Sequence, residues 1–190
     1  MYKYDLGMDA RGMPGKGWIA MDKRRHDTGF RGEEYTLAFE GSIEKHYAAD
    51  PRIVPEARRE AHRFCADAGV SEEDCIALDL ALGEALANAV RHGQQAHDAA
   101  RSEGVTLSLW SYRDAVIAYV HDRGPGFDPP APPYEMPAPT AEYLGGRGLP
   151  LMDMLSDAIL LCRGDAAEGG SSVFLVKRIT GSGRQCRTAV

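Results

Sequence analysis

Three polar side chains occur at one-turn intervals in a stretch that is otherwise mostly apolar. Glu84, Asn88 and His92 are spaced i, i+4 and i+8 in "GEALANAVRHG", which follows the largely apolar run "CIALDLAL". Residues four positions apart are neighbours on a helix surface, so the three side chains form one polar stripe. Because burial of an unpaired carboxylate or amide costs several kcal/mol, something must occupy the space opposite this stripe.

Two kinds of site explain Glu84 and Asn88. The amide oxygen of an asparagine is a hard ligand for Mg²⁺, which keeps several waters and takes few protein ligands. A carboxylate beside it can orient or deprotonate an attacking hydroxyl or water. The alternative is a buried polar network satisfied by backbone groups or ordered water. For His92, at the end of the stretch, we expect capping or packing rather than catalysis.

Two glycine-bearing loops follow along the chain. In "DRGPGFD", Asp122 ends a predicted strand, and Gly124 and Gly126 follow two and four residues later. Glycine lets the backbone approach a ligand closely, and a carboxylate accepts a hydrogen bond from an amino group such as that of adenine. The second loop, residues 145–148, directly precedes a predicted helix, where backbone N–H groups favour phosphate. Each loop alone is a weak signal.

The elements that position these residues follow from apolar periodicity. Alternating or continuous apolar runs predict strands at residues 34–42, 105–112, 115–122, 158–162 and 171–179. Helical spacing predicts one helix that follows Pro51 and ends at Gly69, and another from the N-cap Ser71 to Gly93. A third helix opens at the second glycine loop, with Pro150 in its first turn.

This order of elements predicts an α/β fold, a two-layer sandwich of helices on a mixed, mostly antiparallel sheet. Strands and helices do not alternate regularly, and no GxxxxGK[ST] motif occurs, so Rossmann and P-loop architectures are disfavoured. The 190 residues fit one domain, which we expect at residues 33–179. The segments 1–32 and 180–190 lack periodicity, and we expect a disordered extension and a flexible tail.

Charge and composition exclude several classes of function. Of the net charge of −6, residues 1–31 contribute +3 and residues 180–190 contribute +2, which leaves −11 for residues 32–179. An acidic domain argues against direct nucleic-acid binding. The four cysteines form no CxxC pair, which argues against zinc and disulfides, and no apolar run approaches the roughly 20 residues of a membrane span. We therefore expect a soluble cytoplasmic protein.

The three motifs together are far more specific than any one of them. ExxxN on a helix, DxGxG after a strand and GxGL opening a helix resemble the N, G1 and G2 boxes of the GHKL ATP-binding superfamily. The resemblance covers about residues 34–179 and implies the Bergerat fold. The matching residues are Glu84, Asn88, Asp122, Gly124, Gly126, Gly146, Gly148 and Leu149. Ser171 stands near the last strand, where the family more often has threonine.

The resemblance implies a role for each matching residue. Asp122 would bind the adenine amino group with help from Ser171, and Asn88 would hold Mg²⁺. The glycines of both boxes would shape the phosphate pocket and its lid, while Leu149 completes the second box. Arg147 either contacts a phosphate or faces solvent. Glu84 would act as general base or orient the attacking hydroxyl.

Among the branches of the superfamily, "LALGEALANAVRHG", "GGRGLPLMDMLSD" and "GGSSVFLVKR" look most like the bacterial anti-sigma factor serine kinases. The resemblance implies a serine/threonine protein kinase that uses ATP and Mg²⁺. Its partners would be an anti-anti-sigma (STAS-domain) protein, phosphorylated on serine, and a sigma factor that it sequesters to regulate transcription. Members of this branch often form homodimers.

Two alternatives remain open on the sequence. One is a non-catalytic, ATP-responsive binding module, and the other is a histidine-kinase-type ATPase domain or a regulator of a non-sigma partner. The proline-rich stretch 129–139 lies between the two glycine boxes and departs from the family pattern. It either limits closure of a lid over ATP or is an exposed spacer. The segment 1–32 either contacts a partner or is a passive tail.

Overall fold

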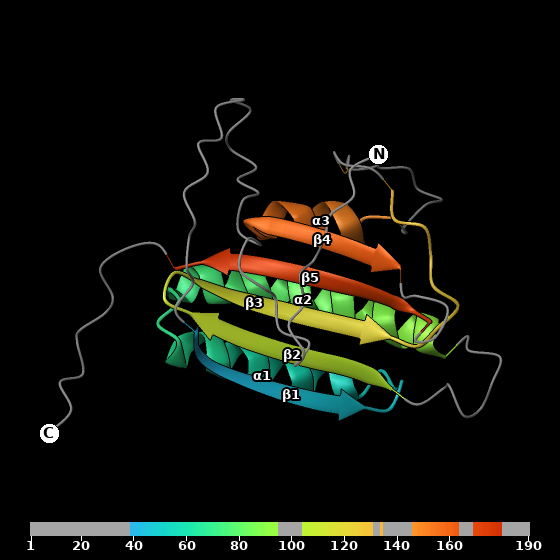
Figure 1. Ribbon diagram of the computed structural model, residues 1–190, viewed down its shortest axis with the longest axis horizontal. Coiled ribbons are helices and arrows are strands. Elements are labelled where there is room, and N and C mark those ends of the chain that lie inside the picture. Colours follow the sequence, from blue (N-terminus) through green and yellow to red (C-terminus); the bar gives the residue numbers. More distant parts are fainter. Residues whose placement is uncertain (1–38, 95–103, 131–133, 135–145, 164–168, 180–190) are drawn as a thin grey trace, which may run out of the picture.

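The computed structural model describes residues 39–94, 104–130, 134, 146–163 and 169–179 (Figure 1). In chain order the elements are β1 (Phe39–Tyr47), α1 (Ile53–Asp67), α2 (Glu72–Gly93), β2 (Val105–Tyr112), β3 (Ala115–Asp122), α3 (Gly148–Leu155), β4 (Ala158–Arg163) and β5 (Ser171–Arg178). The predicted segments 1–32 and 180–190 lie outside the described residues, as does most of the proline-rich stretch 129–139.

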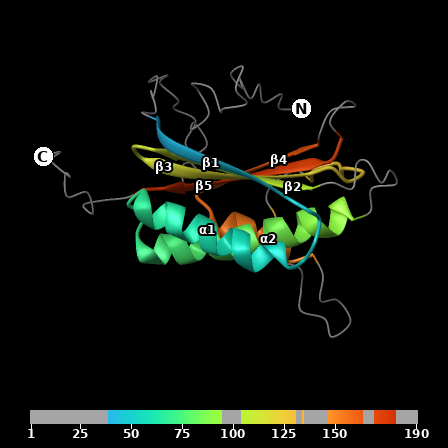
Figure 2. The same ribbon diagram turned by 90° about the horizontal axis from the view of Figure 1, so that it is seen from below.

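The five strands form one sheet in the order β1-β2-β3-β5-β4. Every pairing among these described strands is antiparallel, so the sheet is not mixed. The three helices cover one face of the sheet (Figure 2). The predicted two-layer sandwich is therefore confirmed. In the described part of the chain, no helix is both long enough and apolar enough to cross a membrane.

The first strand extends beyond its predicted end, while residues 34–38 of the prediction lie outside the described residues. It runs from Phe39 to Tyr47 and pairs with the whole of β2, so it continues past the predicted end at Ser42. β1 is an edge strand, so its inward side chains Ile43 and Tyr47 are only half-buried and their neighbours are polar. Such a strand has a weak apolar alternation, which explains why its end was predicted too early.

The helix ends follow the predicted capping residues closely. The hydroxyl oxygen of Ser71 accepts a hydrogen bond from the Asp74 N–H at 3.2 Å and so caps α2. Helix α1 ends at Asp67, just before Gly69, which has a φ of 81°. A glycine tolerates this left-handed conformation, so it turns the chain toward α2.

Helix α2 is the central element of the helical layer. Its buried residues are Cys75, Leu78, Ala81, Leu82, Ala85, Leu86, Ala89, Val90 and Gly93. The side chains of Arg58 and Asp79 pair between α1 and α2, with Nε donating to Oδ1 at 2.9 Å. Lys177 of β5 pairs with Asp74 at 2.8 Å. These contacts hold α2 against both the sheet and α1, so its polar stripe has a fixed position.

Strand alternation decides which side chains face the helices. Trp110, Tyr119 and Phe174 form an aromatic group on the opposite face of the sheet. The ring of His121 stacks on Tyr119 on that same face. The next residue, Asp122, therefore points into the space between the sheet and α2.

Candidate functional site

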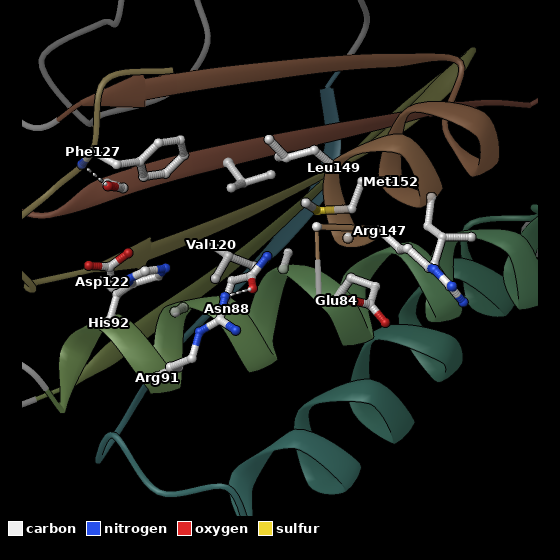
Figure 3. Close-up of a pocket in the computed structure, with 17 residues that line it drawn as sticks. Glu84, Asn88, Arg91, His92, Val120, Asp122, Phe127, Arg147, Leu149 and Met152 are labelled. Carbon is white, nitrogen blue, oxygen red and sulfur yellow. Dashed lines mark hydrogen bonds between the residues drawn. The ribbon is translucent and has the colours of Figure 1, made fainter. Parts of the chain in front are cut away.

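A cavity of about 590 Å³ lies between α2, α3 and the sheet (Figure 3). Its walls come from four segments that are distant in sequence. The lining residues are Glu84, Ala85, Asn88, Ala89, Arg91, His92, Val120, Asp122, Phe127, Gly146, Arg147, Gly148, Leu149, Leu151, Met152, Ser171 and Val173. The structure thus brings together eight of the ten site residues named from the sequence, and leaves Gly124 and Gly126 out of the wall.

The polar stripe of α2 forms one wall of this cavity. Glu84, Asn88 and His92 all line it, because helical spacing turns all three toward the same space. Helix α3 begins directly opposite. A Cβ atom added to Gly148 would lie 3.1 Å from Oε2 of Glu84 and 3.3 Å from Nδ2 of Asn88. Glycine therefore allows the first turn of α3 to approach these two side chains closely.

Asp122 lies at the other end of the cavity and is only 4% exposed. Its Oδ1 accepts a hydrogen bond from the Gly124 N–H at 2.9 Å. Burial raises the pKa of this carboxyl above its ordinary value. Hydrogen bonds from the Gly124 and Ser171 backbones and the nearby rings of His121 and His92 act in the opposite direction. Asp122 is thus a buried acceptor in a fixed position.

The first glycine loop packs behind Asp122 rather than along the cavity wall. A Cβ atom on Gly124 would lie 2.4 Å from the backbone oxygen of His92. Gly126 has a φ of 74°, and its Cβ atom would lie 2.7 Å from the backbone oxygen of Gly170. These glycines allow the loop to contact the end of α2 and the turn before β5. The resemblance implied a phosphate-pocket role, whereas their position here is at the Asp122 end.

The residues around Asp122 include an aromatic pair, His92 and Phe127, that lies outside the three sequence motifs. The ring of Phe127 is stacked with that of His92, with centroids 6.3 Å apart and an angle of 27° between the planes. The Phe127 N–H donates to the Ser171 hydroxyl at 3.2 Å, which links this loop to β5. His92 continues the polar stripe, so its spacing from Glu84 and Asn88 already indicated a position in the same site. Phe127 directly follows the DxGxG motif.

Two arginines add positive charge to the cavity. The Nη2 group of Arg91 donates a hydrogen bond to Oδ1 of Asn88 at 2.7 Å. Arg147 is the N-cap residue of α3 and lines the cavity beside Gly146 and Gly148. The α3 end of the cavity thus combines the Arg147 side chain with the N–H groups of a helix start, a combination that favours phosphate.

The donor set near Glu84 suits an ion that takes few protein ligands. Within the described ranges, no group of three or more His, Cys, Asp or Glu residues could hold a metal ion. Glu84 and Asn88 offer one carboxylate and one amide oxygen on the same helix face. Mg²⁺ bound with a nucleotide takes most of its ligands from phosphates and water, so these two residues fit such an ion.

Comparisons with known proteins agree with this geometry. A family profile described as a histidine kinase-like ATPase domain matches residues 47–177. A crystal structure of the RsbU and RsbW domains of Rv1364c from Mycobacterium tuberculosis is similar over 74% of this chain, at 19% sequence identity and a TM-score of 0.53. The present chain spans 32% of that structure's chain. A comparison with curated proteins gives no match.

The family match covers more than half of the 190 residues and includes α1, α2 and all the cavity residues. The structural neighbour has the same fold. The fold is a two-layer sandwich of helices on a sheet, as predicted, although the sheet is purely antiparallel rather than mixed. An ATPase domain of this type implies ATP binding. The chain therefore belongs to the family of histidine kinase-like ATPase domains, the GHKL superfamily.

Proposed function

We propose that this chain is an anti-sigma factor serine/threonine kinase that binds Mg-ATP in the cavity. Its acceptor is a serine of an anti-anti-sigma (STAS-domain) protein, and it sequesters a sigma factor. The observation that carries the proposal is the placement of Glu84 and Asn88 on one face of α2, in a cavity that ends at buried Asp122. The motif resemblance and a fold shared with a structure that contains an RsbW domain support this branch.

Adenine binds at the Asp122 end of the cavity. The carboxylate of Asp122 accepts a hydrogen bond from the adenine amino group, while the Gly124 N–H holds the carboxylate in place. The His92 and Phe127 rings lie beside it and offer π faces on which a base stacks. Ser171 positions Phe127 through the hydrogen bond from its N–H.

The phosphates lie toward α3. The N–H groups at the start of α3, together with Arg147, stabilise their negative charge. Oδ1 of Asn88 would hold Mg²⁺, which when bound offsets charge on the phosphate oxygens. Glu84 lies one turn away on the same helix face, next to Gly148.

Glu84 serves as the proton acceptor in the transfer step. The serine hydroxyl oxygen attacks the γ-phosphorus as its proton passes to the Glu84 carboxylate. The bond between the γ-phosphorus and the β–γ bridging oxygen breaks, and ADP leaves with the electron pair of that bond. The products are phosphoserine on the partner and ADP.

Calorimetric titration with ATP, with and without Mg²⁺, tests the binding site. We expect Asp122→Ala to weaken ATP binding by tenfold or more, the loss of about one charge-assisted hydrogen bond. Asn88→Ala should remove the dependence on Mg²⁺. Arg59→Ala, an exposed change on α1 outside the cavity, is the control and should bind as the unaltered chain does. Absence of ATP binding by the unaltered chain would overturn the proposal.

Transfer is tested separately with a purified STAS-domain protein as acceptor. Glu84→Gln keeps the size of the side chain but removes the base, so we expect ATP binding to persist and phosphoserine formation to fall by at least a hundredfold. Phosphohistidine would instead indicate a histidine-kinase-type domain. Tight ATP binding with no transfer to any STAS-domain acceptor would favour a nucleotide-responsive binding module.

A further inference from the structure

Arg91 lies against the amide oxygen that the proposed function assigns to a cation. Its Nη2 group donates to Oδ1 of Asn88 at 2.7 Å, and both residues line the cavity (Figure 3). The two residues are three positions apart on α2, a spacing that makes side chains neighbours on a helix. A positively charged donor therefore engages this oxygen before any metal ion does.

The geometry around Asn88 fixes which end of its amide faces Arg91. The Nδ2 group lies on the α3 side, 3.3 Å from the position of a Cβ on Gly148. Turning the amide over would direct its NH₂ group at the guanidinium, and two donors cannot bond to each other. Asn88 therefore presents its oxygen to Arg91 and has no second amide oxygen to offer.

A divalent cation and the guanidinium disfavour each other at this oxygen, because both are positively charged. Mg²⁺ requires ligands at about 2.0–2.1 Å in near-octahedral geometry. A guanidinium nitrogen 2.7 Å from the same oxygen would place two positive charges a few ångströms apart. Binding of one of them therefore weakens binding of the other.

We propose that Arg91 competes with Mg²⁺ for Oδ1 of Asn88 and thereby sets how strongly Mg²⁺ enhances ATP binding. The inference rests on the proposed function, since it assumes that Mg-ATP binds in this cavity. In the absence of nucleotide, Arg91 satisfies the amide oxygen. Binding of the metal releases the guanidinium from Asn88. Arg91 is therefore a positioning residue, because it acts on the metal only through the amide of Asn88.

The test measures how strongly Mg²⁺ enhances ATP binding. This Mg²⁺ enhancement is the ATP dissociation constant in the presence of a chelator, divided by the ATP dissociation constant at a fixed, subsaturating Mg²⁺ concentration. Calorimetry on the full chain supplies both constants. For Arg91→Ala we expect an enhancement about two- to fivefold larger than in the unaltered chain, the scale of an exposed side-chain pair. Arg59→Ala removes the same charge from the neighbouring helix and should leave the enhancement unchanged.

A double-mutant cycle separates competition from a general effect of charge. If Arg91 acts through Asn88, adding Arg91→Ala to the Asn88→Ala variant changes the enhancement no further. A shift that persists in the Asn88→Ala background would overturn the inference, as would an unchanged enhancement in Arg91→Ala. Both of these outcomes leave the proposed function intact. Failure of the unaltered chain to bind ATP at any Mg²⁺ concentration would overturn both.

Discussion

Asp122 illustrates how one side chain can be costly to the fold and useful to the site. It is buried at the end of β3, and burial raises its pKa above the ordinary 3.8. The charged form is thus less stable in the folded chain than in the unfolded chain. A buried carboxylate held by backbone N–H groups is also a well-positioned acceptor for an amino group. The proposed contact with the adenine amino group would explain an ionisable residue at a position where an apolar one would be easier to bury.

The raised pKa of Asp122 predicts a specific dependence of stability on pH. Between 3.8 and its pKa in the folded chain, the folded state binds more protons than the unfolded state. The free energy of unfolding therefore falls as pH rises through this window. Urea unfolding at a series of pH values measures the free energy of unfolding of the unaltered chain and of Asp122→Asn. From about pH 4 upward, we expect this free energy to fall in the unaltered chain relative to the variant. If the difference in free energy between the two chains did not change with pH, the raised pKa of Asp122 would be contradicted.

At this same scale, the sequence motifs identified the polar residues of the site but not its complete wall. Glu84, Asn88 and Asp122 stand out because polar residues interrupt apolar elements. No sequence pattern of this kind distinguishes Arg91 or Phe127 as a site residue. Arg91 is an ordinary helix-surface residue by its pattern, and Phe127 faces His92 only because the loop folds back on the end of α2. The contact of Phe127 with His92 depends on tertiary structure, whereas that of Arg91 with Asn88 is local to α2 but lies outside the sequence motifs.

Among the elements, α2 depends on close approaches that glycine permits. A Cβ atom on Gly83 would lie 3.3 Å from Cδ of Arg58. The glycine inside this helix therefore accommodates the arginine that pairs with Asp79, and α1 packs close to α2. The approaching group comes from a neighbouring helix rather than from the cavity.

The turn before β5 provides a sharp test of backbone packing. Gly170 has a φ of 72°, and its Cβ atom would fall 1.6 Å from the backbone oxygen of Asp122. Gly69 has a φ of 81°, but nothing lies within 4 Å of its Cβ position. We expect Gly69→Ala to cost about 1–2 kcal/mol from the left-handed conformation alone. Gly170→Ala should cost more than about 3 kcal/mol, because backbone must also move.

Urea unfolding of the two glycine variants measures both costs. Equal losses would mean that the contact between Gly170 and β3 relaxes freely and that only the φ strain matters. A larger loss at Gly170 would show that the end of β3, where Asp122 sits, is held rigidly by the neighbouring turn. ATP affinity should then fall in Gly170→Ala and stay unchanged in Gly69→Ala, since Gly69 lies outside the cavity wall.

Element types were predictable from the sequence because the central strands and both long helices have strong patterns. β2, β3 and β5 are almost wholly buried, and α2 has a well-formed N-cap. The end of the edge strand β1 was predicted several residues too early because its inward positions are only half-buried. The purely antiparallel pairing depends on how β4 and β5 are ordered in space, and no local pattern encodes that order.

For the molecule as a whole, the cavity is the place where its two layers meet. Residues from α2 and α3 form one side, and residues from β3 and β5 form the other. Much of the remaining contact between the layers is apolar packing of α2 against the sheet. A ligand in this cavity would therefore bridge both layers and stabilise the folded chain as a unit.

This bridging makes nucleotide binding measurable as stability of the entire domain. A ligand that binds only the folded state, at a free concentration 100 times its dissociation constant, adds about 2.7 kcal/mol to the free energy of unfolding. We expect Mg-ATP to raise the midpoint of urea unfolding accordingly, in a transition that remains single. Asp122→Ala should lose at least about half of this increase at the same ATP concentration, because its affinity is at least about tenfold lower, whereas Arg59→Ala should keep it. If Mg-ATP stabilised both variants equally, the nucleotide would have to bind somewhere other than this cavity.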